Sequence, residues 1–278
     1  MKNQDGLDAL ERNATQTLSD ICRDIEAVND SETVIGSPEM FRSLDLHQGH
    51  PWTSLTDGSI PDANYYRCLG LFVRALRPTR AFEIGTGFGL GFGTILYSGR
   101  DSLRRFTTVD IDRYQENPTD EPIIGNATRS YWAILESPWA AENIFGTFLF
   151  PSLFVLDTQA PKQDSSWEWE ALERRVPDAS LDFLFIDGAH QGDAARNDLE
   201  TFWPKVAPGG VVLVDDLHSV DLAPEHRVHP WCDEVWRGFH GFVSDHASEI
   251  QDFHVWGYPR VGPSVADQRP WGLMRKSS

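Results

Sequence analysis

The sequence predicts an α/β fold, a doubly wound seven-stranded sheet that is mostly parallel and has helices on both faces. Three observations predict it. Short apolar runs alternate with segments of helical periodicity, several of these runs end in carboxylates, and a glycine-rich turn follows the first run. The expected strands are 81–84, 106–111, 153–156, 181–186, 211–214, 252–256 and 272–275, of which the last two would close the sheet as an antiparallel hairpin.

The first 61 residues are predicted to form a helix followed by an irregular cap. Residues 14–28 keep apolar side chains at helical spacing, and this helix could pack on the domain or on a second subunit, so that a homodimer is an expectation. Residues 29–61 are rich in Gly, Ser, Asp and Pro and show no period. We therefore divide the chain into an N-terminal helix and cap segment, residues 1–61, and a main domain, residues 62–278.

The main domain is expected to begin with a helix and to alternate helices with polar connections. Helices are expected at 62–76, 127–144 with an interruption near Pro138, 195–206 and 231–243. Polar connections are expected at 113–126 and 159–178, and Pro208-Gly209-Gly210 is expected to stop a helix before the strand at 211–214.

Composition limits the partners and the compartment. The chain has 278 residues, a formal net charge of −18 and no basic run, which argues against nucleic acid and against an anionic membrane surface. Cys22, Cys68 and Cys232 are too widely spaced for a disulfide framework or a zinc site. The sequence shows neither an apolar signal segment nor a stretch long enough to span a bilayer, so a cytoplasmic protein is expected.

The glycine-rich turn at 83–93, EIGTGFGLGFG, follows the first strand and would let the backbone approach a bound nucleotide closely. A dinucleotide fingerprint requires glycines at i, i+2 and i+5. No register of the loop satisfies it, because the i+5 positions hold Leu90, Phe92, Thr94 and Leu96. The loop instead reads acidic-x-Gly-x-Gly-x-Gly. Without further support it could also be an ordinary tight turn between a strand and a helix.

Three carboxylates are predicted to meet at one edge of the sheet. The strand at 181–186 ends at Asp187 and the strand at 211–214 ends at Asp215 and Asp216. Neighbouring parallel strands lie about 4.8 Å apart, so these side chains would share a small volume. Crowded like charges need a cation, which favours a hard divalent metal. In the alternative, one aspartate caps the following helix and the others face solvent.

From about residue 60 to residue 276, the order EIGTGFG, VDID, IDGAH, helix, PGGVVLVDD and GLMRK resembles the Rossmann-like class I S-adenosylmethionine-dependent methyltransferases. It is most similar to the metal-dependent O-methyltransferases of the catechol, caffeoyl-CoA and macrocin types. The resemblance implies that Mg²⁺ or another divalent cation is held by Asp187, Asp215 and Asp216. It also implies that S-adenosylmethionine is bound at Glu83, Gly85, Thr86, Gly87, Gly89, Asp110, Asp157 and Asp187. In this reading Asp110 holds the ribose, with Asp112 as the competing register, and Asp157 lies near the adenine.

The chain departs from the resembled types in two ways: an extra formal charge at Asp216, which favours a metal, and different residues in the place of the base, which leave the general base open. The catechol type has an amide in the place of Asp216 and a lysine base where this chain has His190. The macrocin type usually has a second acid in the place of Ala189. His190, with a reference pKa near 6.5, and His218 are therefore both candidate bases, acting beside the metal ligand Asp187.

The expected activity is metal-dependent O-methylation of a hydroxylated small molecule, such as a natural-product, sugar or phenolic intermediate of secondary metabolism. Trp52 and Trp231, in expected loops near the site, are candidate substrate contacts. Two alternative hypotheses about the function remain. A cephalosporin-hydroxylase-like metal enzyme on the same scaffold would consume oxygen, and a non-catalytic S-adenosylmethionine-binding protein would bind the methyl donor without turnover.

Overall fold

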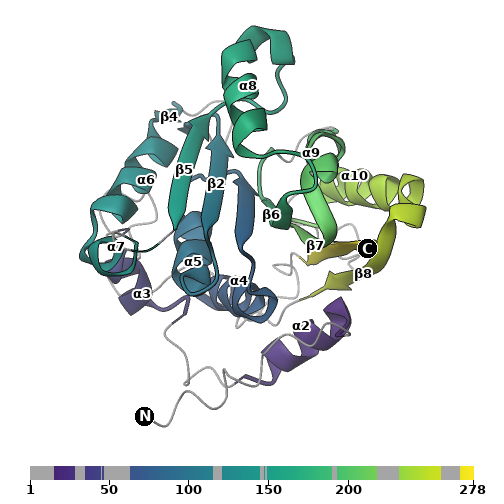
Figure 1. The fold of residues 1–278 in the computed structure, drawn as a ribbon, viewed down its shortest axis with the longest axis horizontal. Coiled ribbons are helices and arrows are strands. Elements are labelled where there is room, and N and C mark those ends of the chain that lie inside the picture. The colour runs from purple at the N-terminus through teal and green to yellow at the C-terminus, as the bar shows by residue number, and fades with distance from the viewer. Residues whose placement is uncertain are drawn as a thin grey trace.

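The computed structural model describes residues 16–28, 35–44, 46, 63–114, 121–144, 147, 149–189, 193–217, 232–257 and 270–278. Within them a seven-stranded sheet has the order β5-β2-β1-β6-β7-β9-β8 (Figure 1). Its strands are β1 Arg80–Ile84, β2 Arg105–Asp110, β5 Phe150–Val155, β6 Leu181–Ile186, β7 Val206–Val214, β8 Ile250–Trp256 and β9 Trp271–Lys276. The predicted fold class is confirmed.

The strand order creates one place where a ligand is expected. Strands β5, β2, β1, β6 and β7 are parallel to one another, whereas β9 runs antiparallel to both β7 and β8. From β1 the chain first adds strands on one side, β2 and β5, and then crosses to the other side with β6 and β7. Ligands of such sheets bind outside the carboxyl ends of the strands at this switch point, here between β1 and β6.

Helices cover both faces of the sheet and enclose two hydrophobic cores. The first face is covered by α4 (Ala63–Leu76) and α5 (Leu90–Gly99), and the second by α8 (Ser166–Arg175), α9 (Ala194–Phe202) and α10 (Cys232–Asp245). The strands serve both cores by alternation, since Phe183 and Phe185 of β6 face the first and Leu184 and Ile186 face the second. Near the β5 edge lie α6 (Asn126–Glu136) and α7 (Pro138–Asn143), separated where an interruption near Pro138 was expected.

The amino-terminal helix α2 (Leu18–Glu26) packs on the carboxyl-terminal hairpin of the same chain. Its first backbone amide, that of Leu18, donates to Asp252 at 2.7 Å, and Trp256 Nε1 donates to Glu26 at 2.6 Å. A capping box between Thr17 and Asp20 starts the helix. The helix thus uses its apolar face inside this chain. A homodimer and a boundary at residue 61 stay predictions.

Two helices occur where the sequence predicts none. In the expected cap, α3 (Pro38–Ser43) begins at an N-cap Ser37 with proline in its first turn and buries Met40 and Phe41. In the expected polar connection 159–178, α8 follows a 3₁₀ turn, Lys162–Ser165, and places Trp169 in the second core. Both helices are short and bury few side chains, so their periodicity is weak.

Three smaller differences concern strands. β7 begins at Val206 and includes Pro208-Gly209-Gly210, because a bulge opposite β6 between Leu181 and Phe183 accommodates this turn within the strand. β5 begins at Phe150, before the predicted 153. A two-residue pairing of β3 (Arg113–Tyr114) with β4 (Ile123–Ile124) lies within the expected loop 113–126.

Two findings concern the cysteines and the helices. Cys22 and Cys68 are buried free thiols, as predicted, whereas the Cys232 side chain lies outside the description. Among the helices that the structure describes, none has both the length and the apolar character that a bilayer crossing requires.

Candidate active site

The glycine loop after β1 has a backbone that only glycine tolerates at its closest contact. Gly85 has a φ of +92°, and a Cβ there would lie 1.9 Å from the carbonyl oxygen of Asp187, which closes β6. Gly87 has a φ of +51°, and a Cβ there would meet nothing within 4 Å. The loop therefore contacts the end of β6 on one side and leaves its backbone open on the other, as a cradle for a ligand requires.

A polar network lies beneath this loop. Glu83 of β1 is fully buried and accepts a hydrogen bond of 2.7 Å from Thr108 Oγ1, which in turn lies 2.5 Å from Thr86 Oγ1. A Cβ on Gly91 would lie 2.6 Å from Glu83 Oε1, so the carboxyl group sits directly under the first turn of α5. Burial, followed by the charges of Asp187 and Asp110, raises the pKa of Glu83 well above its usual range.

The two acids at the end of β2 have different structural partners. Asp110 accepts from the amide of Gly87 at 2.8 Å and from that of Asp112 at 2.6 Å, which places its carboxylate against the glycine loop. Asp112 accepts from the amide and hydroxyl of Thr128 at 2.9 and 2.6 Å and so fixes the start of α6. Asp110 is therefore the better placed of the two for a ribose, and that role stays a prediction.

The end of β5 carries Asp157 and leads to an acid that the sequence interpretation missed. Asp157 is exposed and accepts from the amide of Gln159 at 2.8 Å. Asp198 on α9 is buried, accepts from Gln159 Nε2 at 2.8 Å and has no hydrogen-bond partner at Oδ2 among the described residues. Burial raises the pKa of Asp198 to about 7. Its position three residues after Ala195, on the buried stripe of the helix, is a signal that could have revealed it.

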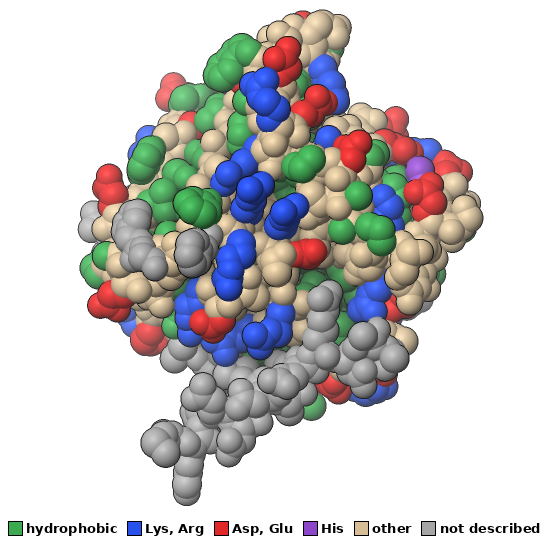
Figure 2. Space-filling view, viewed as in Figure 1, with side chains coloured by type: hydrophobic (Ala, Val, Ile, Leu, Met, Phe, Trp, Pro, Cys, Tyr) green, Lys and Arg blue, Asp and Glu red, His purple; other side chains and the backbone are tan. Residues whose placement is uncertain are grey.

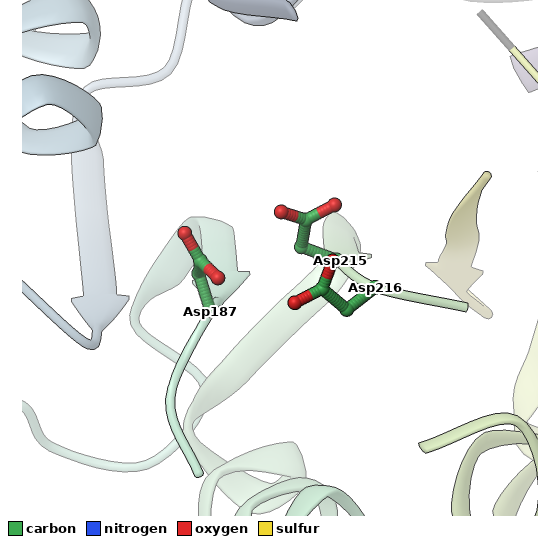
Figure 3. A group of neighbouring side chains, drawn as sticks. All are labelled: Asp187, Asp215 and Asp216. Atoms are coloured by element: carbon green, nitrogen blue, oxygen red, sulfur yellow. The ribbon is translucent and has the colours of Figure 1, made fainter. Parts of the chain in front are cut away.

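The three predicted carboxylates do converge. Asp187, Asp215 and Asp216 each offer an oxygen, and these oxygens lie within 4.8 Å of one another. Figure 3 shows the side chains of Asp215 and Asp216, from the end of β7, beside that of Asp187, from the end of β6. The strand pairing continues into the cluster, since the amide of Asp215 donates to Ile186 O at 2.9 Å. The geometry matches the oxygen set that a hard divalent cation prefers.

Burial and mutual repulsion make this cluster fit a cation. Asp215 is 7% exposed and Asp216 is 3% exposed, and Asp215 Oδ1 has no hydrogen-bond partner among the described residues. Burial, then the charges of Asp216 and Asp187, raises the pKa of Asp215 well above its usual range. Asp216 also has a left-handed φ of +58°, a backbone that Asn and Asp adopt more readily than other residues with a side chain.

A second residue outside the sequence predictions lies at the cluster. The hydroxyl group of Tyr65, near the start of α4, favours the charged form of Asp215 and so lowers the pKa of Asp215. This effect opposes burial and the two neighbouring carboxylates, which raise that pKa. Edge-on ring contacts with Tyr66 at 4.8 Å and Trp271 at 5.2 Å hold Tyr65, which is 6% exposed. The first helix of the domain thus reaches the predicted metal site.

The remaining predicted site residues lie outside the described part of the chain. These are the candidate bases His190 and His218 and the candidate substrate contacts Trp52 and Trp231.

Comparison with known proteins agrees with this geometry. Residues 82–217, from β1 to the end of the acidic pair, match the family model described as a methyltransferase domain. Residues 82–217 are a class I methyltransferase domain. The resemblance recognised in the sequence is thereby confirmed over these residues, which make up just under half of the chain.

Solved structures are similar to this chain at low sequence identity. A protein of Klebsiella pneumoniae provisionally assigned as an O-methyltransferase is 17% identical, covers 89% of this chain and 94% of its own, and has a TM-score of 0.51. The O-methyltransferase TomG of Streptomyces achromogenes, involved in tomaymycin synthesis and solved with S-adenosylmethionine, is 18% identical over 86% of this chain and 89% of its own, with a TM-score of 0.49. No curated protein sequence matches the chain.

Proposed function

We propose that this methyltransferase transfers the methyl group of S-adenosylmethionine to a hydroxyl oxygen of a small metabolite, with a divalent cation, Mg²⁺ or another, held by Asp187, Asp215 and Asp216. One observation carries the proposal. The three buried or half-buried carboxylates stand at the tips of β6 and β7 with their oxygens within 4.8 Å, and Asp187 also touches the glycine loop. The cluster and the cofactor cradle are therefore adjacent.

On the cofactor side, each residue has a proposed task. The backbone of Gly85, Thr86, Gly87 and Gly89 would carry the methionine part, with Glu83 fixing the loop from below. Asp110 would accept from the ribose hydroxyls and Asp157 would lie toward the adenine. The sulfonium of the bound cofactor supplies the methyl group.

On the substrate side, the carboxylates would orient the acceptor. A divalent cation among them lowers the pKa of a hydroxyl group that it binds. Asp215 and Asp216 fix one side of that position, and Asp187, whose carbonyl oxygen lies against Gly85 of the cofactor loop, fixes the other. His190, three residues after Asp187, and His218, two residues after Asp216, are the proposed bases that take the hydroxyl proton.

Oxygen as the acceptor atom has two supports. Oxygen ligands crowded around a hard cation suit a hydroxyl substrate, and the Klebsiella pneumoniae protein that shares the fold is assigned as an O-methyltransferase. A natural-product, sugar or phenolic substrate from secondary metabolism, and a cytoplasmic location, are parts of this proposal.

The test uses a trideuteromethyl-labelled methyl donor and a panel of catechols, sugars and glycosylated natural products, read by mass spectrometry. We expect transfer to a hydroxyl, its loss with a chelator and its return with Mg²⁺ or Mn²⁺. Asp215→Asn should abolish transfer while S-adenosylhomocysteine still binds, and the exposed Asp164→Asn should change neither. Metal-independent transfer would refute the metal role. Oxygen consumption with added iron would favour the hydroxylase reading, and binding without turnover on the panel would favour a binding protein.

A further inference from the structure

Basic side chains gather on one part of this acidic chain. Seven arginines lie at or beside the amino-terminal ends of the central strands, and we call them the arginine face: Arg74, Arg77, Arg80, Arg100, Arg104, Arg105 and Arg175. Figure 2 shows a band of Lys and Arg side chains down the middle of one face of the molecule. The chain as a whole has a net charge of −18, so the remaining surface is more acidic still.

The sheet brings the central members of the face together. Arg80 and Arg105 stand directly opposite each other in the pairing of β1 with β2. The amides of Arg104 and Arg105 both donate to Thr79 O, at 2.8 and 3.1 Å. These three arginine side chains are exposed.

The outer members continue the face on both sides. Arg175 donates from its guanidinium group to Phe150 O at 2.9 Å, and burial together with the charge of Arg105 lowers the pKa of Arg175. On the other side, burial and the charge of Arg100 lower the pKa of Arg74. The positive charges are therefore close enough to repel one another.

Among the described residues, the face has few counter-charges. None of its seven arginines forms an ion pair with a described residue, whereas Arg23, Arg42 and Arg174 elsewhere each do. Two acids lie near. Asp101 attracts Arg74, and Asp182 accepts from the amide and hydroxyl of Thr79 and the amide of Arg80 with one oxygen. That oxygen of Asp182 accepts from two backbone amides and the Thr79 hydroxyl and not from a guanidinium group.

We propose that the arginine face docks an acidic segment of a partner protein. Guanidinium groups bind carboxylates through two parallel hydrogen bonds, and a carboxylate-rich segment would relieve the repulsion that the face retains. A long polyanion such as duplex nucleic acid would extend beyond the face and be repelled by the surrounding negative surface. A short acidic segment interacts mainly with charges within a Debye length of about 8 Å, which are those of the face.

The arginine face lies away from the proposed catalytic site. The arginines flank the amino-terminal ends of β1 and β2, while the carboxylate cluster stands at the carboxyl ends of β6 and β7. A partner bound there leaves the cofactor cradle and the carboxylates open. The surface suits tethering of the enzyme to an acidic protein.

The experiment measures fluorescence anisotropy of a short labelled peptide of alternating Glu and Ser, with a Gln–Ser peptide as the neutral probe. The test variant is Arg80→Gln/Arg104→Gln/Arg105→Gln, and the matched control is Arg23→Gln/Arg42→Gln/Arg174→Gln, which has the same net charge. We expect the wild-type chain to bind only the acidic peptide, and the test variant to bind it about tenfold more weakly or worse, with less than about a twofold change in the control. Binding should weaken as salt rises from about 20 to about 150 mM.

Several results would overturn the proposal. Absence of peptide binding, or equal weakening in both triple variants, would show that no local docking face exists. Tighter binding of a DNA duplex or of phosphatidylserine vesicles than of the peptide would assign the face to another partner. Self-association of the wild-type chain in sedimentation, lost in the test variant, would replace the partner with a second copy. Thermal unfolding of each variant establishes that it is folded, and methyltransferase activity should stay unchanged in both.

Discussion

Replacing Asp215 with Asn should stabilise the metal-free protein and remove its response to metal. The substitution keeps the side-chain volume and deletes one of three carboxylates whose oxygens lie within 4.8 Å. At that separation two unit charges repel by about 3.5 kcal/mol with an effective dielectric constant of about 20, and by about 0.9 kcal/mol in water. We therefore expect metal-free Asp215→Asn to be about 1 to 3.5 kcal/mol more stable than wild type at alkaline pH.

The sign of the pH dependence follows from the raised pKa. A carboxyl group whose pKa is raised by folding keeps its proton in the folded protein, so stability is lost as the pH rises from its usual pKa toward the raised value. The gain from Asp215→Asn should thus be small at pH 4 and grow toward pH 8.5. In the wild-type chain, metal at about 100 times its dissociation constant should add about 2.7 kcal/mol, or about 5 to 10 °C in Tm.

The assay is urea and thermal unfolding by circular dichroism with a chelator, with MgCl₂ and with MnCl₂. Asp164→Asn, at an exposed site with the same change in charge, is the control and should behave as wild type. A metal-free Asp215→Asn variant that is less stable than wild type throughout the pH range would refute the repulsion argument. Equal stabilisation of both proteins by metal would refute the assignment of the ligands.

Four further predictions concern single side chains. Asp110→Asn should weaken S-adenosylhomocysteine binding about 10- to 100-fold in isothermal titration, since charged hydrogen bonds are lost, whereas Asp112→Asn should destabilise α6 with little change in binding. Gly87→Ala should cost about 1 to 2 kcal/mol of stability and block cofactor binding. Gly85→Ala should fail to fold, because its Cβ would overlap the carbonyl oxygen of Asp187. A folded, active Gly85→Ala variant would contradict the loop geometry. The raised pKa of Asp198 should cost the wild-type chain at most about 4 kcal/mol of stability as the pH rises from 4 to 7. Asp198→Asn should remove this loss. If the stability of the variant depends on pH as that of the wild type does, the prediction is wrong. Tyr65→Phe should weaken metal binding several-fold in titration calorimetry without unfolding the domain, and unchanged affinity would show that its hydroxyl group has no role at Asp215.

The site could be predicted from the sequence where one physical rule decided the position. A buried parallel strand is a short apolar run, and the polar residue after it must lie at the carboxyl edge of the sheet. For this reason Asp187, Asp215 and Asp216 could be placed together before any coordinates. The glycine spacing likewise separated this loop from a dinucleotide site.

Other features depend on tertiary contacts that leave little trace in the sequence. The helix α8 buries mainly Trp169 and Leu172, too few for a clear period, and Asp198 is polar on an otherwise apolar stripe. The arginine face is assembled from residues spread between positions 74 and 175, so a search for a basic run could not find it.

Two requirements fall on Asp216: its backbone must adopt a left-handed conformation, and its side chain contributes a carboxylate to the cluster. Few amino acids adopt that backbone at low cost, and among them only aspartate also brings a negative charge. Drift at this codon should therefore pass mainly through asparagine or glycine, which keep the turn and reduce the charge of the cluster by one. If the cluster holds the proposed cation, such a substitution would weaken cation binding and leave the backbone of the turn unchanged.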